Sequence, residues 1–341
     1  MKTGIVFDSI FLRHNQLGHP ENAKRLESVM HALETKGLAE KLDHIKSRLA
    51  ELNELTECQS ENYIEYVKEF CEKGGGYLDP DTYSNSASFL AASIAVGSSI
   101  DLTKSVISGE MKNGFALVRP PGHHALSNRS MGFCLFGNIA IAAKVALKRA
   151  GIKKVAIVDF DVHHGNGTQA LVGDDPNILF ISSHQYPFYP GTGSIKEIGS
   201  GDSKGTIVNI PLQAGVGDVG LKKVYEEIVI PSLHRFKPDI ILVSAGYDAH
   251  WDDPLANLNL SLTGFNQISR QLLIAANDIC SGKIIFFLEG GYNLDVLANG
   301  VSNTIRGLLS IESFEDPLGK SDIDEPEIKN LVIELKKIHS L

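Results

Sequence analysis

The sequence has few cysteines, and their spacing does not indicate a disulfide framework or a thiolate metal site. Only four occur among 341 residues, and none belongs to a C-x-x-C pair. Disulfide-rich domains and structural zinc sites need cysteines at closer, paired spacings. We therefore expect four buried structural thiols, at Cys58, Cys71, Cys134 and Cys280.

Long apolar runs, internal repeats and linkers are also missing. No apolar run approaches the roughly 20 residues that cross a bilayer. The start of the chain, Met-Lys-Thr-Gly-Ile-Val-Phe, turns polar too soon for a secretory signal. The glycine-rich stretches at 74–76 and 199–205 are interpreted as loop turns. We predict one domain over residues 1–341 in a soluble, cytoplasmic protein without membrane contact.

No charge of one sign dominates the sequence. Lysine and arginine number 32 and acidic residues 41, which gives a net charge of −9 with both signs interspersed. An extended electrostatic footprint for nucleic acid is therefore not expected. The sequence leaves open whether the chain forms a homo-oligomer.

The strongest pattern in the sequence is an alternation of short apolar runs with longer amphipathic segments. Continuous Val/Ile/Leu/Phe runs are typical of parallel strands covered on both faces. Strands are predicted at Gly4–Phe7, Phe115–Val118, Val155–Phe160, Ile178–Ser182, Thr206–Ile210, Ile240–Ser244 and Ile284–Leu288. Helices are predicted at Asn22–Lys36, Ala87–Ser108, Asn138–Ala150, Val219–Arg235, Gly264–Cys280, Leu294–Leu309 and about Glu325–His339. This alternation predicts an α/β fold with a mostly parallel sheet.

Four of the predicted strands are followed by clusters of histidine, carboxylate or tyrosine. Ligands of open parallel sheets bind beyond the carboxyl ends of the strands, so these clusters are expected to meet. They are Arg-Pro-Pro-Gly-His123-His124, Asp159-Phe-Asp161-Val-His163-His-Gly-Asn166-Gly, Ala-Gly-Tyr-Asp248-Ala-His250 and Glu289-Gly-Gly-Tyr292.

The second cluster indicates a metal site. Residues at i, i+2 and i+4 of an extended segment point the same way, so Asp159, Asp161 and His163 are expected to share one side. Asp248 could add another oxygen from a neighbouring strand end. Three protein ligands plus a water are the usual arrangement of catalytic zinc. A capping aspartate and a solvated histidine would be the non-functional interpretation of this segment alone.

Hydrolysis would need more than a metal. It needs a base for the water, an acid for the leaving amine and a donor for the developing oxyanion. His123 and His124 could supply the first two, and Tyr292 the third. Alone, a histidine pair or a Gly-Gly-Tyr turn carries little information, and their value lies in the constellation.

Taken together, these segments resemble the zinc-dependent histone deacetylases and their bacterial relatives, the acetylpolyamine and acetoin-utilisation amidohydrolases. The matching segments occur in the order of that family across nearly the whole chain. They are His19-Pro-Glu21, Arg119-Pro-Pro-Gly-His-His124, Gly132-Phe-Cys134, Asp159-x-Asp161-x-His163-His-Gly-Asn-Gly-Thr168, Tyr189-Pro-Gly-Thr192, Ser244-Ala-Gly-Tyr-Asp248 and Glu289-Gly-Gly-Tyr292. The Pro-Pro-Gly-His-His and His-His-Gly-Asn-Gly forms look most like class II. The resemblance implies a three-layer α/β/α domain of the arginase/deacetylase type.

The resemblance implies one zinc ion per chain, bound by Asp161, His163 and Asp248. His124 looks like the general base and acid, with His123 as an electrostatic helper.

Asp159 and Asn166 then look like the partners that orient the rings of the two histidines. Tyr292 would polarise the acyl carbonyl. Some class II members carry histidine at that position and are poor deacetylases, so tyrosine favours a working enzyme.

The resemblance also implies a narrow tunnel for the acyl-lysine side chain. Phe133 and Tyr189 match its two walls, and Gly132 and Gly291 lie beside them in the matching segments. The family often has phenylalanine where Tyr189 stands, so the tunnel would be slightly more polar here. Asp81 is the candidate for a rim carboxylate that holds the substrate backbone, with Asp79 as the alternative.

A structural monovalent cation, usually potassium, is implied as well. The residues that correspond to that site are Asp159, Asp161, His163, Ser182 and Ser183.

Substrate class is suggested by the residue after Asp253-Pro254. One polyamine-selective group has glutamate there to attract a distal ammonium, whereas this chain has Leu255. An acylated lysine in a peptide or protein is therefore favoured over an acetylpolyamine or another acylated amine.

Two further alternatives remain at this point. A binuclear manganese hydrolase of the arginase fold would need additional carboxylates, and Asp252 and Asp253 keep that interpretation open. The other alternative is a catalytically idle acyl-lysine binder, against which the intact His123, His124 and Tyr292 set argues.

Overall fold

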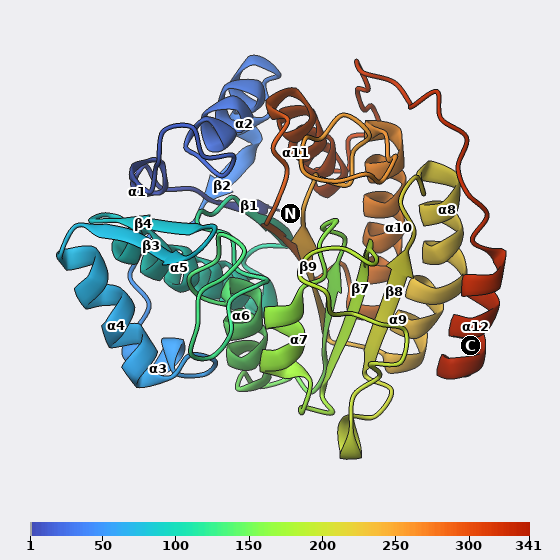
Figure 1. Ribbon diagram of the computed structural model, residues 1–341, viewed down its shortest axis with the longest axis horizontal. Helices are drawn as coiled ribbons and strands as arrows, with labels where there is room; N and C mark the ends of the chain where they lie inside the picture. The colour runs from blue at the N-terminus through green and yellow to red at the C-terminus, as the bar shows by residue number, and fades with distance from the viewer. Residues whose placement is uncertain (1) are drawn as a thin grey trace.

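The computed structural model describes residues 2–341 and centres on one sheet of eight parallel strands (Figure 1). Its order is β2-β1-β5-β10-β9-β6-β7-β8, and every neighbouring pair is parallel. In chain order the strands are β1 (Thr3–Val6), β2 (Leu42–His44), β5 (Asn113–Ala116), β6 (Val155–Asp159), β7 (Ile178–Gln185), β8 (Ile207–Leu212), β9 (Ile240–Ala245) and β10 (Ile284–Leu288). A separate antiparallel hairpin consists of β3 (Gly75–Asp79) and β4 (Thr82–Asn85).

Helices cover both faces of the sheet and complete the predicted three-layer α/β/α domain. One layer contains α2 (Lys24–Thr35), α8 (Asp218–Val224), α9 (Ile230–Phe236), α10 (Leu262–Cys280), α11 (Leu294–Leu308) and, at its edge, α12 (Lys329–His339). The other contains α1 (Ile10–Arg13), α3 (Leu52–Leu55), α4 (Glu61–Glu72), α5 (Ser88–Ser108), α6 (Asn138–Leu147) and α7 (Asn166–Val172). Short turns η1 (Ala39–Lys41) and η2 (Gly201–Ser203) and the π-helical turn η3 (Tyr225–Val229) complete the elements.

The seven predicted strands of the main sheet are all present. Their central members are buried along their whole length, as parallel strands between two helical layers must be. The strand predicted at 115–118 begins earlier, at Asn113, because Gly114 pairs with Gly4 and the Leu102 side chain fills the space beside both. The helix predicted at 219–235 is continuous from 218 to 236 but contains the η3 turn.

Some predicted boundaries are wrong. Gly75 and Gly76 are not a turn but the start of strand β3. The C-terminal helix starts at Lys329, because the Glu325 carboxylate instead accepts hydrogen bonds from the backbone N–H of Gly217, Val219 and Gly220 at the start of α8, at 2.9–3.0 Å. That interaction ties the last segment of the chain to the start of α8.

Helix α5 is an exception to the expectation that no apolar segment is long enough to cross a bilayer. Its 21 residues are long and apolar enough to cross a membrane by length and composition, but 67% of the most apolar window is buried inside the protein. The helix packs on α6, β5 and β1, as the core helix of a layered domain does.

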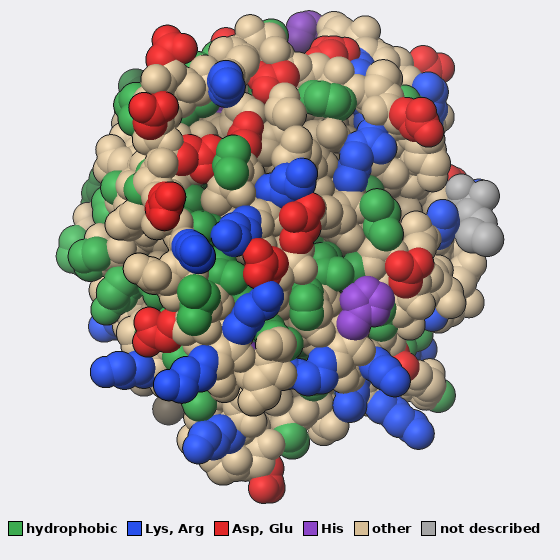
Figure 2. Space-filling model, turned by 90° about the vertical axis from the view of Figure 1, so that its right-hand side faces the viewer, with side chains coloured by type: hydrophobic (Ala, Val, Ile, Leu, Met, Phe, Trp, Pro, Cys, Tyr) green, Lys and Arg blue, Asp and Glu red, His purple; other side chains and the backbone are tan. Residues whose placement is uncertain are grey.

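Charges of both signs occur on the face of the molecule that carries α8, α9 and α12 (Figure 2). Acidic and basic side chains are interspersed there, with basic ones more frequent at the lower edge (Figure 2). Some are paired between elements, for example Lys336 with Glu227 at 2.6 Å. The face thus has no field of one sign over its whole width.

Candidate active site

Four neighbouring strands at the centre of the sheet bring the predicted clusters together. They are β5, β10, β9 and β6, which stand side by side in that order. Because all four are parallel, the loops that follow them leave at the same edge. His124, Tyr292, Asp248 and His163 therefore come from four different loops, and three of them line one pocket.

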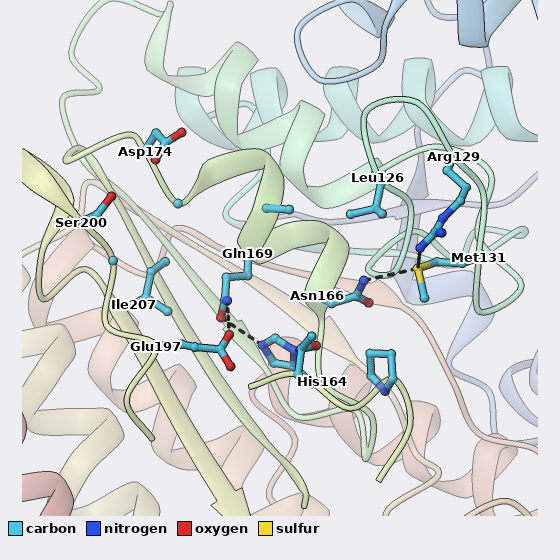
Figure 3. Close-up of a pocket in the computed structure, with 15 residues that line it drawn as sticks. Leu126, Arg129, Met131, His164, Asn166, Gln169, Asp174, Glu197, Ser200 and Ile207 are labelled. Carbon is cyan, nitrogen blue, oxygen red and sulfur yellow. Dashed lines mark hydrogen bonds between the residues drawn. The ribbon is translucent and has the colours of Figure 1, made fainter. Parts of the chain in front are cut away.

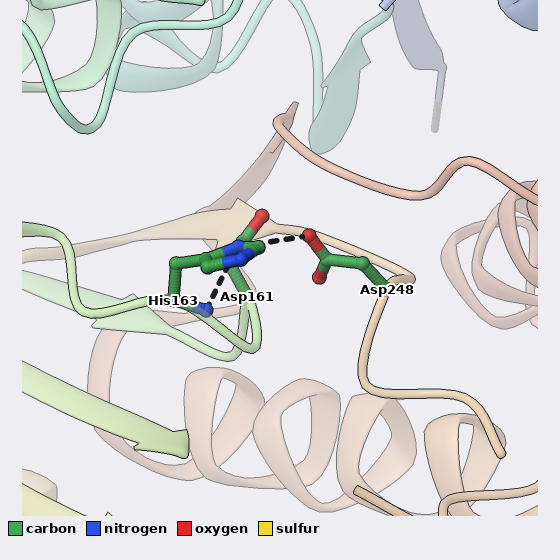
Figure 4. Close-up of side chains that lie close together, drawn as sticks. All are labelled: Asp161, His163 and Asp248. Atoms are coloured by element: carbon green, nitrogen blue, oxygen red, sulfur yellow. Dashed lines mark hydrogen bonds and ion pairs between the residues drawn. The ribbon is translucent and has the colours of Figure 1, made fainter. Parts of the chain in front are cut away.

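The metal-ligand cluster is formed by Asp161, His163 and Asp248 (Figure 4), whose ligand atoms lie within 4.8 Å of one another. His163 Nδ1 is 3.1 Å from Asp161 Oδ1 and 3.3 Å from Asp248 Oδ2. The expectation that Asp159 shares this side is wrong. Strand β6 ends at Asp159, the chain turns there, and that carboxylate contacts His123 instead.

This cluster fits a tetrahedral zinc ion. Ligand atoms about 2.0–2.2 Å from zinc are about 3.3–3.6 Å apart in a tetrahedron, close to the spacings of His163 Nδ1 from the two carboxylates. Asp248 Oδ2 is buried and accepts no hydrogen bond from the described residues, although it lies near His163. A buried carboxylate oxygen in that state is explained by a cation at this point. Two aspartates and one histidine also leave one position open, as catalytic zinc sites do.

The adjacent histidines have different hydrogen-bond partners. His123 Nδ1 is 3.0 Å from Asp159 Oδ2, and His124 Nδ1 is 2.7 Å from Asn166 Oδ1. The two rings are 4.0 Å apart between centroids. The predicted pairings of Asp159 and Asn166 with the two rings are therefore present in the structure.

These partners separate the charge states of the two rings. Burial opposes a charge on His123, but Asp161, Asp159 and Glu289 outweigh it and raise its pKa well above the usual value. Burial lowers the pKa of His124 well below the usual value, and the positive His123 adds to that effect. These shifts favour the charged form of His123 and the neutral form of His124.

Tyr292 follows a turn that the side chains of Arg25 and Asp161 fix. Arg25 donates from Nε to the Gly291 carbonyl at 2.7 Å and from Nη2 to the Glu289 carbonyl at 2.5 Å. Gly290 N–H donates to Asp161 Oδ2 at 2.8 Å. Burial, and then Asp248, raises the pKa of the Tyr292 phenol well above its usual value, so the hydroxyl stays protonated.

A narrow pocket of about 190 Å³ leads from the surface to these groups. It is lined by Asp81, His124, Gly132, Phe133, His163, Phe188, Tyr189, Leu255 and Tyr292. All predicted wall and rim residues except Gly291 are among them. Gly291 lies behind Tyr292, where its φ of +117° favours glycine.

Two features of the wall follow from close packing. A Cβ at Gly132 would lie 2.2 Å from a ring carbon of His124, so only glycine fits there. Phe188, which sequence reasoning missed, stacks on His163 with centroids 5.5 Å apart and an angle of 20°. The sequence signal that could have identified Phe188 is its position directly before Tyr189, another aromatic residue.

The structure distinguishes the two rim aspartates. Asp81 lines the pocket, whereas Asp79 does not. Thr82 Oγ1 donates to Asp81 at 2.9 Å and accepts from Phe133 N–H at 3.1 Å, which links the hairpin to the wall. Burial, and then repulsion from Asp81, raises the pKa of Asp79.

The residues of the predicted potassium site lie at the ends of β6 and β7. Asp159 and Ser182 are register partners on these strands. Ser182 Oγ is 2.9 Å from His184 Nδ1, and Ser183 Oγ is buried without a hydrogen-bond partner among the described residues. The assignment of a monovalent cation stays a prediction.

Two buried carboxylates support the site although they were not assigned a role. Glu289 accepts from the N–H groups of Gly122 and His123 at 2.7 and 3.1 Å, so it anchors the histidine loop. Burial raises its pKa to about 7. Glu21 pairs with Arg119 and Arg25, all three being fully buried. Both acids lie in segments that the sequence singled out, but their partners are distant in sequence.

A second cavity adjoins Asn166, the hydrogen-bond partner of His124 (Figure 3). It has a volume of about 490 Å³, and Asn166 and Met131 form part of its wall. Asn166 Nδ2 contacts Met131 Sδ at 3.4 Å, while a chain of hydrogen bonds runs from His164 through Gln169 to Glu197. Its wall contains both polar and apolar side chains, and it shares no lining residue with the narrow pocket.

The aspartates that would have supported a binuclear site are used elsewhere. Asp252 accepts from the side chain of Asn293, and Asp253 accepts from backbone N–H groups. Among residues 2–341, one group with metal-ligand geometry is found. The geometry therefore favours a single metal ion.

Comparison with known proteins agrees with this arrangement. A family model described as histone deacetylase domain matches residues 19–308. Histone deacetylase 14, chloroplastic, of Arabidopsis thaliana is 40% identical over 98% of this chain and 84% of its own length. A probable deacetylase of Archaeoglobus fulgidus is 37% identical over 100% of this chain and 98% of its own length. The crystal structure of the HDA15 HD domain matches with a TM-score of 0.90 and 36% identity, covering 99% of this chain and 94% of that one.

The fold and the site thus define a hydrolase of the deacetylase type. The chain belongs to the histone deacetylase family.

Proposed function

We propose that this deacetylase uses one zinc ion to remove acetyl or other acyl groups from lysine side chains in peptides or proteins. The observation that carries the proposal is the buried cluster of Asp161, His163 and Asp248 at the base of a narrow pocket that His124 and Tyr292 also line. Zinc bound there would supply a Lewis acid and lower the pKa of an attacking water.

His124 is placed to move the protons. The Asn166 Oδ1 atom accepts a hydrogen bond from Nδ1 of His124. The hydrogen of the neutral ring is therefore assigned to Nδ1, and Nε2 has a free lone pair. Nε2 can take a proton from the attacking water and give it to the leaving amine. The raised pKa of His123 favours its charged form, and that charge beside His124 would stabilise negative charge in the transition state.

Tyr292 is placed to stabilise the developing oxyanion. Its protonated hydroxyl can donate a hydrogen bond to the acyl oxygen, and Arg25 and Asp161 fix the turn that holds it. Loss of one such donor typically lowers the rate by about 10²–10³.

The shape of the pocket supports an unbranched alkyl amine as substrate. Phe133, Tyr189 and Leu255 line a space of about 190 Å³. An ammonium group at this apolar side would lose hydration without gaining a partner. Asp81 also lines the pocket and is available for the polar backbone of a peptide. These features favour an acyl-lysine peptide over an acetylpolyamine.

The test is a comparison of kcat/KM for acetyl-lysine peptides, longer acyl-lysine peptides and acetylspermidine. We expect every measurable rate to require the metal and the peptides to be preferred. Leu255→Glu should shift the preference towards acetylspermidine. A parent enzyme that prefers acetylspermidine to every peptide would contradict the lysine assignment, and full activity without metal would contradict the mechanism.

We also propose that a monovalent cation binds near Asp159 and Ser182, supported by their adjacency and by the unpaired Ser183 hydroxyl in the described structure. A dependence of thermal stability on potassium over sodium would test it.

A further inference from the structure

Asp253 lies between the loop that carries Leu255 and the turn that holds Tyr292. Its side chain is buried and both carboxylate oxygens accept backbone hydrogen bonds. Oδ2 accepts from Tyr292 N–H at 2.7 Å and from Asn293 N–H at 3.2 Å. Oδ1 accepts from Leu255 N–H at 3.0 Å. One carboxylate therefore joins the loop after β9 to the loop after β10.

The residues that it joins are both part of the pocket wall. Leu255 and Tyr292 line the same narrow pocket from these two loops. Gly291, the residue before Tyr292, has a φ of +117°. Glycine has more conformational freedom than other residues, so the turn at this position is easily altered unless neighbouring groups hold it. Arg25 and Asp161 hold residues 289–291 on the other side of that glycine, so Asp253 alone fixes the amide of the tyrosine itself.

The position is electrostatically unfavourable for a carboxylate. Burial, and then repulsion from Asp248, raises the pKa of Asp253 to about 7. The three backbone donors satisfy the carboxylate oxygens in this position.

We propose that Asp253 is a positioning residue that ties the turn of Tyr292 to the loop of Leu255 and so holds the Tyr292 hydroxyl in place for turnover. This inference rests on the proposed role of Tyr292. A displacement of about 1 Å of a catalytic group can lower a rate by about 10²-fold, so loss of the amide bonds should act on kcat.

The experiment compares the parent, Asp253→Asn, Tyr292→Phe and the double variant, all as metal-loaded full chains, on an acetyl-lysine peptide. Asparagine keeps the volume but offers one acceptor oxygen, so one of the two loops loses its bond. We expect Asp253→Asn to lower kcat about tenfold or more with a change in KM below about threefold. The double variant should be no slower than Tyr292→Phe within about twofold, because Asp253 acts through the tyrosine.

Asp252→Asn is the matched control. It is the same substitution at the preceding, more exposed residue, which contacts the Asn293 side chain and not the Tyr292 amide. It should stay within about twofold of the parent. Metal content and the thermal transition of each variant establish that the fold and the metal cluster are intact. If Asp253→Asn does not fold, Asp253→Ser, which retains one acceptor in a smaller volume, takes its place.

The outcomes separate this inference from the proposed function. A Tyr292→Phe variant as fast as the parent overturns the role of Tyr292 and this inference with it. A slow Tyr292→Phe together with parental kcat in Asp253→Asn overturns this inference alone. It is also overturned if Asp253→Asn slows Tyr292→Phe by the same factor as it slows the parent, since the effect would then not pass through the tyrosine.

Discussion

The buried carboxylate of Glu21 provides the sharpest test of what stabilises the site. Glu21 is fully buried between two arginines that are also fully buried. Arg119 pairs with both of its oxygens, one of them through Nη2 at 2.8 Å, and Arg25 Nη1 lies at 3.1 Å. Burial disfavours the charge of Glu21, but Arg119 and Arg25 outweigh it and hold its pKa well below the usual range.

Glu21→Gln keeps the shape of the side chain and removes its charge. Two buried guanidinium groups then share no carboxylate, and breaking a buried ion pair costs about 3–5 kcal/mol. The entropy of unfolding is about 2.1 cal/mol/K per residue, or about 0.7 kcal/mol/K for 341 residues. We therefore expect a drop in Tm of only about 4–7 °C, although the loss in free energy of unfolding is a large part of the about 5–15 kcal/mol typical of a domain.

Asp101→Asn is the matched control. Asp101 makes a bidentate pair with Arg48 at 2.7 and 2.8 Å, the same contact in a partly exposed position. Side chains exposed by 29% and 33% should contribute less than about 1 kcal/mol. Urea unfolding followed by circular dichroism gives both free energies. A loss below about 1 kcal/mol for Glu21→Gln, or equal losses in the two variants, would refute the reasoning from burial.

Three further results are expected. Asp161→Ala should lose metal and activity together. His124→Ala should keep its metal and lose most turnover, as measured by elemental analysis and peptide assays. An active His124→Ala enzyme would contradict the proton-transfer role. Burial lowers the pKa of His14 to about 3 against about 6.5 when unfolded, so the native state binds fewer protons and stability falls as the pH drops through that window. His14→Asn should therefore reduce the pH dependence of urea unfolding below pH 6.5 by up to about 1.4 kcal/mol per pH unit, and an unchanged slope would argue against a neutral His14.

The sequence predicts the central part of the fold well because its signals are local there. Val155–Asp159 and Ile284–Leu288 are apolar runs that only a two-sided burial explains, and both are strands. The β3–β4 hairpin was missed because it is partly exposed and begins with glycines, so neither hydrophobic alternation nor propensity marks it.

The site shows the same division. That the strand ends would gather the ligands followed from the parallel order, and Asp161, His163 and Asp248 do meet. The turn after Asp159 was not predictable from a period-two rule, because the strand ends at that residue. The contacts of Asp253 depend on loops from two strands that pack together, which no local pattern specifies.

The position of β10 in the sheet has a consequence for how the protein is made. This strand, at residues 284–288, lies between β5 and β9 and joins a half-sheet of β2, β1 and β5 to one of β9, β6, β7 and β8. On the ribosome, both halves emerge before the strand that connects them, each with an open inner edge of apolar residues. Such edges favour pairing with other chains. Nascent chains stalled before residue 284 should therefore depend on chaperones more than longer nascent chains that include β10. The loop carrying Tyr292 would be the last part of the active site to be synthesised.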